Sequence, residues 1–186
     1  MNEFVLDVPK NNFPGIFLNP VQAVENFGLE LGMQVADFGA GAGHFTKAMA
    51  DVVGGSGKVT AIDILGSTLE VIEGQKRIGG LFQIQTMRGD LEKLNGSNLP
   101  DGSQDLVLCA NVLHQVQKPE NVLSEAHRVL KLGGKLFVID WFEHGILGPT
   151  QRISKDLVEK LAFEVGLKKT REIDAGGSHY GIEFKK

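Results

Sequence analysis

Short apolar, β-branched runs alternate along this chain with longer segments whose apolar residues recur at helical spacing. The first kind is typical of buried strands and the second of amphipathic helices. The predicted strands are 35–38, 58–64, 82–87, 105–109 and 136–141. The predicted helices are 20–28, 45–53, 68–78, 119–130 and 155–165. Strands separated by helices pair in parallel through right-handed crossovers, so the pattern predicts an α/β sheet with helices on both faces.

The last part of the chain breaks this alternation. Two further runs, 167–173 and 180–184, are separated only by Ala175-Gly176-Gly177-Ser178. So short a glycine-containing connection is typical of a hairpin rather than of a crossover. The chain therefore predicts a parallel sheet that is completed by an antiparallel strand.

Helix boundaries are indicated by caps and glycines. Asn19 before Pro20 predicts the start of the first helix, and Ser154 the start of the last. The pairs Gly79-Gly80 and Gly133-Gly134 are interpreted as helix stops. Residues 1–19 show no sustained period but contain several phenylalanines, Phe17 among them, which predicts an N-terminal arm and candidate lid on a domain of residues 20–186.

Composition excludes several classes of protein. A chain of 186 residues suits one domain, and its single cysteine, Cys109, permits neither an intramolecular disulfide nor a cysteine-based zinc site. A net charge of −4 gives no electrostatic signal for general nucleic-acid binding. No apolar run reaches the length of about 18 residues that a membrane helix needs, and the N-terminus does not resemble a signal peptide. We therefore expect a cytoplasmic protein without a bound metal; composition leaves the oligomeric state open.

The most informative segment is VADFGAGAGHF, residues 35–45, where a predicted strand turns into a helix. Glycines in such a turn tolerate positive φ and let a ligand approach the backbone. A dinucleotide-binding loop would need a small residue where this chain has His44. Asp37, two residues before Gly39, instead suits a cationic ligand and would be unfavourable beside a pyrophosphate. S-adenosylmethionine, which carries an ammonium group and a sulfonium centre, matches this chemistry.

The chain resembles the class I S-adenosylmethionine-dependent methyltransferases over almost its whole length. The resemblance rests on five segments in the expected order: VADFGAGAG, KVTAID, RGDLEKL, DLVLCANVLHQV and RVLKLGGKLFVID. It implies a Rossmann-like seven-stranded sheet of order 3-2-1-4-5-7-6 with the last strand antiparallel. It also implies S-adenosylmethionine as cofactor, leaving as S-adenosylhomocysteine.

The resemblance also implies cofactor contacts. Asp63 would bind the ribose hydroxyls, as a carboxylate can bind a diol through both oxygens, with Ile64 packing on the adenine. Asp90, with Leu91 beside it, would accept from the adenine amino group. The remaining cofactor-binding candidates lie at the ends of the first and fourth strands: Asp37, Gly39, Ala40, Gly41, Gly43 and Asn111.

Residues that act on the acceptor should follow the fourth and fifth strands, because ligands of open α/β sheets lie beyond the carboxyl ends of the strands. His114 and His144 are the acid–base candidates, although methyl transfer requires a base only when the nucleophile must lose a proton. The substrate-contact candidates are Phe17, Gln115, Trp141, Phe142 and Arg152.

Several functions remain open. The segments most resemble the small-molecule branch, which includes quinone-biosynthesis and arsenite methyltransferases, and a single cysteine argues against the arsenite reaction. We expect a small-molecule acceptor. The alternatives are an RNA or protein methyltransferase, a non-catalytic cofactor-binding partner subunit, and a nucleotide-dependent oxidoreductase, which His44 and Asp37 oppose.

Overall fold

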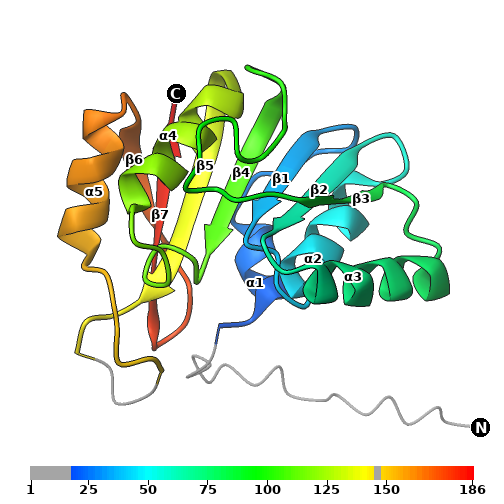
Figure 1. Ribbon diagram of the computed structural model, residues 1–186, viewed down its shortest axis with the longest axis horizontal. Coiled ribbons are helices and arrows are strands. Elements are labelled where there is room, and N and C mark those ends of the chain that lie inside the picture. Colours follow the sequence, from blue (N-terminus) through cyan, green and yellow to red (C-terminus); the bar gives the residue numbers. More distant parts are fainter. Residues whose placement is uncertain (1–17, 145–147) are drawn as a thin grey trace, which may run out of the picture.

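The computed structural model describes residues 18–144 and 148–186. Its centre is a seven-stranded sheet of order β3-β2-β1-β4-β5-β7-β6 (Figure 1). The strands are β1 (Gln34–Phe38), β2 (Lys58–Asp63), β3 (Ile84–Arg88), β4 (Gln104–Ala110), β5 (Leu130–Trp141), β6 (Lys168–Asp174) and β7 (His179–Lys185). β7 is antiparallel to both of its neighbours, while β1 to β5 pair in parallel. The predicted strand order and the antiparallel last strand are confirmed.

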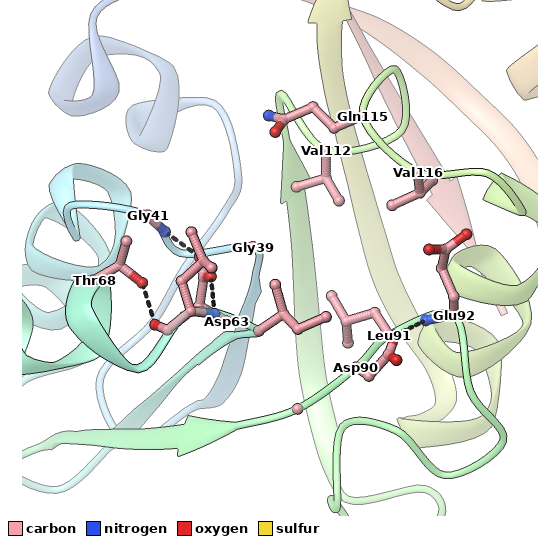
Figure 2. Close-up of a pocket in the computed structure, with 13 residues that line it drawn as sticks. Gly39, Gly41, Asp63, Thr68, Asp90, Leu91, Glu92, Val112, Gln115 and Val116 are labelled. Carbon is pink, nitrogen blue, oxygen red and sulfur yellow. Dashed lines mark hydrogen bonds between the residues drawn. The ribbon is translucent and has the colours of Figure 1, made fainter.

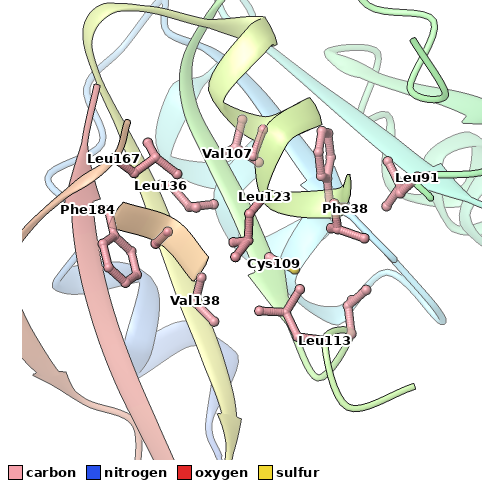
Figure 3. Packing of buried hydrophobic residues seen from close by; sticks show 14 of the residues in the cluster. Phe38, Leu91, Val107, Cys109, Leu113, Leu123, Leu136, Val138, Leu167 and Phe184 are labelled. Atoms are coloured by element: carbon pink, nitrogen blue, oxygen red, sulfur yellow. The ribbon is translucent and has the colours of Figure 1, made fainter. Parts of the chain in front are cut away.

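Helices cover both faces of this sheet, as expected (Figure 1). The helices are α1 (Pro20–Glu25), α2 (His44–Val53), α3 (Gly66–Gly79), α4 (Pro119–Val129) and α5 (Lys155–Glu164). Apolar residues of α1, α2 and α3 form one core layer with one face of the sheet, and those of α4 and α5 form the other. Figure 3 shows the second layer, in which Leu123 of α4 packs over Val107, Leu136 and neighbouring strand residues.

Three predicted helix boundaries are confirmed by their capping contacts. The side chain of Asn19 accepts from the amides of Val21 and Gln22, and Ser154 accepts from the amide of Leu157. Gly80 ends α3 in the left-handed conformation, with φ of 65°.

The prediction that Gly133-Gly134 ends a helix is wrong. α4 already ends at Val129, and the buried Leu130 adopts an extended conformation and pairs with Gln104 of β4. The free carbonyls at this helix end are satisfied by Lys186, whose ammonium group donates to the carbonyl oxygens of His127 (2.7 Å) and Leu130 (2.8 Å). The glycine pair instead lies within an irregular start of β5, where the register against β4 shifts.

The parallel strands bring the candidate site residues to one edge of the sheet. Asp37, Asp63, Asn111 and Trp141 all lie at or just after the carboxyl ends of their strands. The expected arm 1–19, including Phe17, lies outside the described residues except for Leu18 and Asn19. No helix in the described part of the chain is long and apolar enough to cross a membrane.

Candidate active site

The loop from Gly39 to Gly43 joins β1 to α2, and its three glycines serve two different steric purposes. A Cβ on Gly39 would lie 2.3 Å from Cγ2 of Val112, and one on Gly43 would lie 2.7 Å from Cγ1 of Ile72. Both glycines therefore permit close packing, against the segment after β4 and against α3. A Cβ on Gly41 would meet nothing within 4 Å, so this residue presents open backbone to the site.

Asp63, the last residue of β2, fixes this loop. One carboxylate oxygen accepts from the amide of Gly41 (2.9 Å), and the other accepts from the amide of Leu65 (2.9 Å). The side chain is nevertheless 9% exposed at the cavity wall. Each oxygen retains a further lone pair, so Asp63 can bind two additional hydroxyl donors while it holds the loop.

A first cavity of about 400 Å³ opens beside Asp63 (Figure 2). Its walls come from the glycine loop, the ends of β2 and β3 and the segment after β4: Gly39, Gly41, Asp63, Ile64, Leu65, Thr68, Gly89, Asp90, Leu91, Glu92, Val112, Gln115 and Val116. Ile64 and Leu65 are more than half exposed, and Leu91 and Val112 add apolar surface to the same cavity. This combination suits a flat apolar ring attached to a polyhydroxylated group.

The loop after β3 is held in place by its own carboxylates. Asp90 accepts from the amide of Glu92 (3.2 Å) and pairs with Lys93 (3.1 Å), and the hydrogen bond from Lys93 holds the pKa of Asp90 below its usual value. Glu92 accepts from the amides of Gln117 (2.7 Å) and Lys118 (2.6 Å). These hydrogen bonds join the segment after β3 to the segment after β4, which form two walls of the cavity.

A second cavity of about 410 Å³ adjoins the first and shares Gly39, Gly41 and Gln115 with it. Its other lining residues come from the ends of β1, β4 and β5, the start of β7 and the beginning of α1 and α2: Leu18, Pro20, Asp37, Ala40, His44, Phe45, Ala110, Asn111, Trp141 and His179. The shared loop therefore has one ligand-sized space on each side.

Asp37 is the buried carboxylate of the second cavity. It is 2% exposed and accepts from the hydroxyl of Thr46 (2.6 Å). Burial, with the nearby Asp63 charge as a smaller contribution, raises the pKa of Asp37 to about 6, although the Thr46 hydrogen bond opposes the shift. A carboxylate that is penalised in this way gains from a cationic group placed beside it.

Two further polar groups of the second cavity are buried without partners. The side-chain oxygen of Asn111 and both ring nitrogens of His179 find no hydrogen-bond partner among the described residues. Asn111 also has a positive φ of 58°, which is uncommon outside glycine and often marks a functional position. Since buried polar groups are normally paired, these three atoms indicate a space that a polar ligand fills.

Sequence reasoning missed His179. It is the first residue of β7 and lies opposite Trp141, the last residue of β5, with ring centroids 4.0 Å apart. The predicted hairpin did indicate that the start of its second strand lies beside the site. It could not indicate which residue lies there, because the register of that strand on the fifth strand cannot be read from either segment alone.

The other candidates occupy different positions. His114 is 8% exposed and lines neither cavity; its Nδ1–H donates to the fully buried carboxylate of Asp140 (2.7 Å). His144 is exposed, and Phe142 packs edge-on against Tyr180 with centroids 6.1 Å apart. Arg152 donates to the backbone carbonyls of Pro149 and Phe142, so it joins the two sides of the segment after β5.

A family profile described as a methyltransferase domain matches residues 36–138, which run from β1 into β5 and include most of both cavity walls. The chain belongs to this methyltransferase family. The fold and the solved structures below place it among the class I S-adenosylmethionine-dependent methyltransferases, whose cofactor is S-adenosylmethionine.

Several members of the family are similar to this methyltransferase chain. The ubiquinone/menaquinone biosynthesis C-methyltransferase UbiE of Ectopseudomonas mendocina is 35% identical over 66% of this chain and 47% of its own length. The arsenite methyltransferase of Aquipseudomonas alcaligenes is 33% identical over 59% of this chain and 33% of its own length. The chain thus spans half or less of these two relatives.

A solved structure covers nearly all of the methyltransferase chain. The SAM-dependent methyltransferase of Aquifex aeolicus superposes with a TM-score of 0.83 at 27% identity, covering 91% of this chain and 90% of its own. Within residues 18–144 and 148–186, no group of histidine, cysteine and acidic side chains is arranged to hold a metal ion.

Proposed function

We propose that this protein transfers the methyl group of S-adenosylmethionine to a small-molecule acceptor bound in the second cavity. The observation that carries the proposal is the pair of adjoining cavities at the carboxyl ends of the strands, one on each side of the exposed Gly41 backbone. A cofactor with a nucleoside at one end and a charged amino acid at the other can lie across this loop and occupy both.

The first cavity fits the nucleoside. We assign the ribose hydroxyls to Asp63, whose two oxygens are already oriented by the amides of Gly41 and Leu65. Ile64, which is 54% exposed, and Leu91 supply apolar surface for the adenine. Asp90 lines the same cavity and is the acceptor for the adenine amino group.

The second cavity fits the amino-acid end. An ammonium group beside Asp37 would stabilise the ionised form of this buried carboxylate, and a donor beside Asn111 would satisfy its unpartnered side-chain oxygen. Ala40 and Gly41, which directly follow Gly39, also line this cavity. Gly43 supports the loop from outside the cavity, because its lack of a side chain lets α3 pack closely against the loop.

The chain's own contribution to methyl transfer is largely positioning. S-adenosylmethionine supplies an activated methyl group, so the protein must align the acceptor and exclude water. Gln115 lies between the two cavities, and its side chain donates to the backbone carbonyl of Asn111 (2.6 Å), which fixes the segment after β4. Trp141 forms the opposite wall of the acceptor end. Arg152 and Phe142 support the loop that follows Trp141.

A small acceptor is favoured by the size of the second cavity and by the relatives, whose names refer to ubiquinone and menaquinone biosynthesis and to arsenite. The single cysteine, Cys109, is 1% exposed in the core, and burial raises the pKa of its thiol well above the ordinary value. A buried neutral thiol cannot act as a metalloid ligand, so we do not assign arsenite as the acceptor.

The test is calorimetric titration of the purified chain with S-adenosylmethionine, S-adenosylhomocysteine and NADH. We expect micromolar binding of the first two compounds, and its loss in Asp63→Ala but not in Asp51→Asn, a surface control on α2. Tighter binding of NADH would overturn the assignment. Radiolabelled methyl transfer to small-molecule extracts then decides the acceptor class: label in RNA or protein would replace the small molecule, and binding without transfer to any fraction would indicate a non-catalytic subunit.

A further inference from the structure

The acceptor end of the second cavity contains a histidine that none of the proposed cofactor contacts uses. We propose that His179 binds the acceptor and takes its proton during methyl transfer, and that the acceptor is a neutral compound with a weakly acidic hydroxyl or thiol. The inference rests on the proposed methyltransferase function and assigns the proton-accepting residue of the same site.

The position of His179 is built by the sheet. β7 runs antiparallel to β5, and the cross-strand pair of Trp141 with His179 lies at the edge where the site opens. The two rings are 4.0 Å apart and inclined by 41°, which holds the imidazole against the cavity wall. The imidazole is therefore held by the backbone pairing of its strand and by ring contact, and not by hydrogen bonds from its ring nitrogens.

Its ring nitrogens are buried and without hydrogen-bond partners among the described residues. His179 as a whole is 4% exposed. An imidazole that only filled the core would leave two buried polar atoms unsatisfied, which folded proteins avoid. The same cavity contains the unpartnered oxygen of Asn111, which is assigned to the amino-acid end of the cofactor, so His179 is the unsatisfied group left for the acceptor.

The charges around His179 favour a neutral ring that can accept a proton. Burial lowers the pKa of His179; the carboxylate of Asp140 opposes this shift and His114 adds to it. Asp37 and His44 are the other titratable groups that line the cavity. At neutral pH one ring nitrogen is thus unprotonated, and Asp140 lies near enough to stabilise the imidazolium that forms later.

The reaction balances with this assignment. As the acceptor attacks, a bond forms between its oxygen or sulfur and the methyl carbon, and the bond from that carbon to the sulfonium sulfur breaks. Both electrons of the broken bond stay on the sulfur, which becomes a neutral thioether. The acceptor's proton passes to the free nitrogen of His179, so the positive charge moves from the cofactor to an imidazolium that the charge of Asp140 stabilises.

The basicity of His179 selects the acceptor. A neutral imidazole with a lowered pKa can receive a proton from a thiol or phenol, with ordinary pKa values of about 8.5 and 10, far more easily than from an alcohol, which is much less acidic. Because Asp37 is assigned to the ammonium group of the cofactor, the apolar walls from Leu18, Phe45 and Ala110 disfavour an acceptor that enters as a second ammonium ion. The reacting group of the acceptor is therefore a neutral, weakly acidic O–H or S–H group.

The experiment uses the full chain, labelled with ¹³C at histidine Cε1 and saturated with S-adenosylhomocysteine. The probes are phenol and benzyl mercaptan, both neutral at pH 7, with anisole as the matched compound that lacks the acidic proton. We expect His179 to titrate below the ordinary histidine pKa, and its resonance to shift with one or both acidic probes but not with anisole. The absorbance of the responding probe should move toward its ionised form, and the comparison of the two distinguishes a hydroxyl from a thiol site.

Two substitutions complete the test. His179→Gln should bind the responding probe about tenfold more weakly and without the absorbance change. His127→Gln, the same change on α4 away from both cavities, should bind it as wild type does. An unresponsive His179 resonance, equal binding by His179→Gln, or preferential binding of benzylamine overturns this inference. Loss of S-adenosylhomocysteine binding by wild type would instead overturn the proposed function, so the two failures are distinguishable.

Discussion

The carboxylate of Asp63 accepts a hydrogen bond from the amide of Gly41 across 2.9 Å, which joins the end of β2 to the exposed backbone of the glycine loop. The contact spans 22 positions of sequence and exists only because β1 and β2 are parallel neighbours. The proposed ribose-binding residue therefore also sets the conformation of the loop that separates the two cavities.

Substitution of Asp63 should consequently affect binding through both contacts. We expect Asp63→Asn to weaken S-adenosylhomocysteine binding at least tenfold, because an amide offers one acceptor oxygen where the carboxylate offers two. Asp63→Ala should weaken it further, since the Gly41 amide then loses its partner. Calorimetry measures both, with Asp51→Asn as the surface control. Unchanged affinity in Asp63→Ala would show that the ribose binds elsewhere.

Gly39→Ala should mainly lower the stability of the fold, whereas Gly41→Ala should mainly weaken cofactor binding. Gly39 has a φ of 71° and its Cβ would lie 2.3 Å from Val112, so we expect a loss of roughly 2–4 kcal/mol in unfolding free energy. At Gly41 the Cβ meets open space, and the cost should be the backbone strain alone, about 1–2 kcal/mol. Gly41→Ala should nevertheless bind the cofactor poorly, because its methyl group enters the ligand space.

Chemical denaturation and calorimetry on the same samples check this contrast. The double variant Gly39→Ala/Val112→Ala should recover part of the lost stability if the clash with Val112 is the cause. A Gly41→Ala protein that binds S-adenosylhomocysteine as tightly as wild type would contradict the position assigned to the loop.

The structure brings the predicted cofactor-binding residues together at one edge of the sheet because they are local to strand ends; their contacts with the cofactor stay a prediction. Asp37, Asp63 and the glycine loop each follow a recognisable buried strand, and parallel strands bring their ends together whatever the details of packing. The acceptor half depends on longer-range geometry. His179 reaches the site only through the register of β7 on β5, and His114 is turned away from both cavities by its pairing with Asp140.

The end of α4 shows a second limit of local reasoning. Gly133-Gly134 looks like a helix stop, but Lys186, 56 positions after Leu130, satisfies the free carbonyls and lets β5 begin early.

We expect Lys186→Met to lower the unfolding free energy by about 1–2 kcal/mol, because it removes charge-assisted hydrogen bonds at a helix end. The exposed neighbour substitution Lys185→Met should cost less; an equal loss in both would contradict the capping role. Urea denaturation measures both.

The raised pKa of Asp37 predicts a dependence on pH. Between 3.8 and about 6 the folded state holds a proton that the unfolded state has released, so stability should fall as pH rises through this window. The loss amounts to about 3 kcal/mol if the full shift is expressed, and Asp37→Asn should not show it. Denaturation of both proteins from pH 4 to pH 7 tests the slope; parallel curves would show that Asp37 is not the responsible group.

Cofactor binding should respond to the same group with the opposite sign. An ammonium group favours the ionised carboxylate, so S-adenosylhomocysteine affinity should rise with pH up to about 6 and then level off. Calorimetry in buffers of different ionisation enthalpy should detect the proton that Asp37 releases on binding. Asp37→Asn should bind weakly, without this dependence; a rise that persists in the variant would assign the proton to another residue.

The buried pair of His114 and Asp140 supplies the last prediction. Asp140 is fully buried and accepts from the ring and amide of His114 and from the amide of Trp141, so it fixes the segment after β4 against the end of β5. We infer that His114 positions Asp140 rather than contacting the acceptor.

His114→Leu removes a donor from a buried carboxylate and should lower the unfolding free energy by roughly 3 kcal/mol, whereas His114→Asn, whose amide can replace Nδ1, should lower it by less than half of that. Both variants should bind S-adenosylhomocysteine within a factor of two of wild type, because His114 lines neither cavity. The decisive measurement is the NMR titration of His179: its pKa should rise in both His114→Leu and His114→Asn, since the charge of His114 is one of the contributions that lower it. A His114→Leu protein of normal stability with an unmoved His179 would mean that the two histidines act independently, and His114 would return as a direct catalytic candidate.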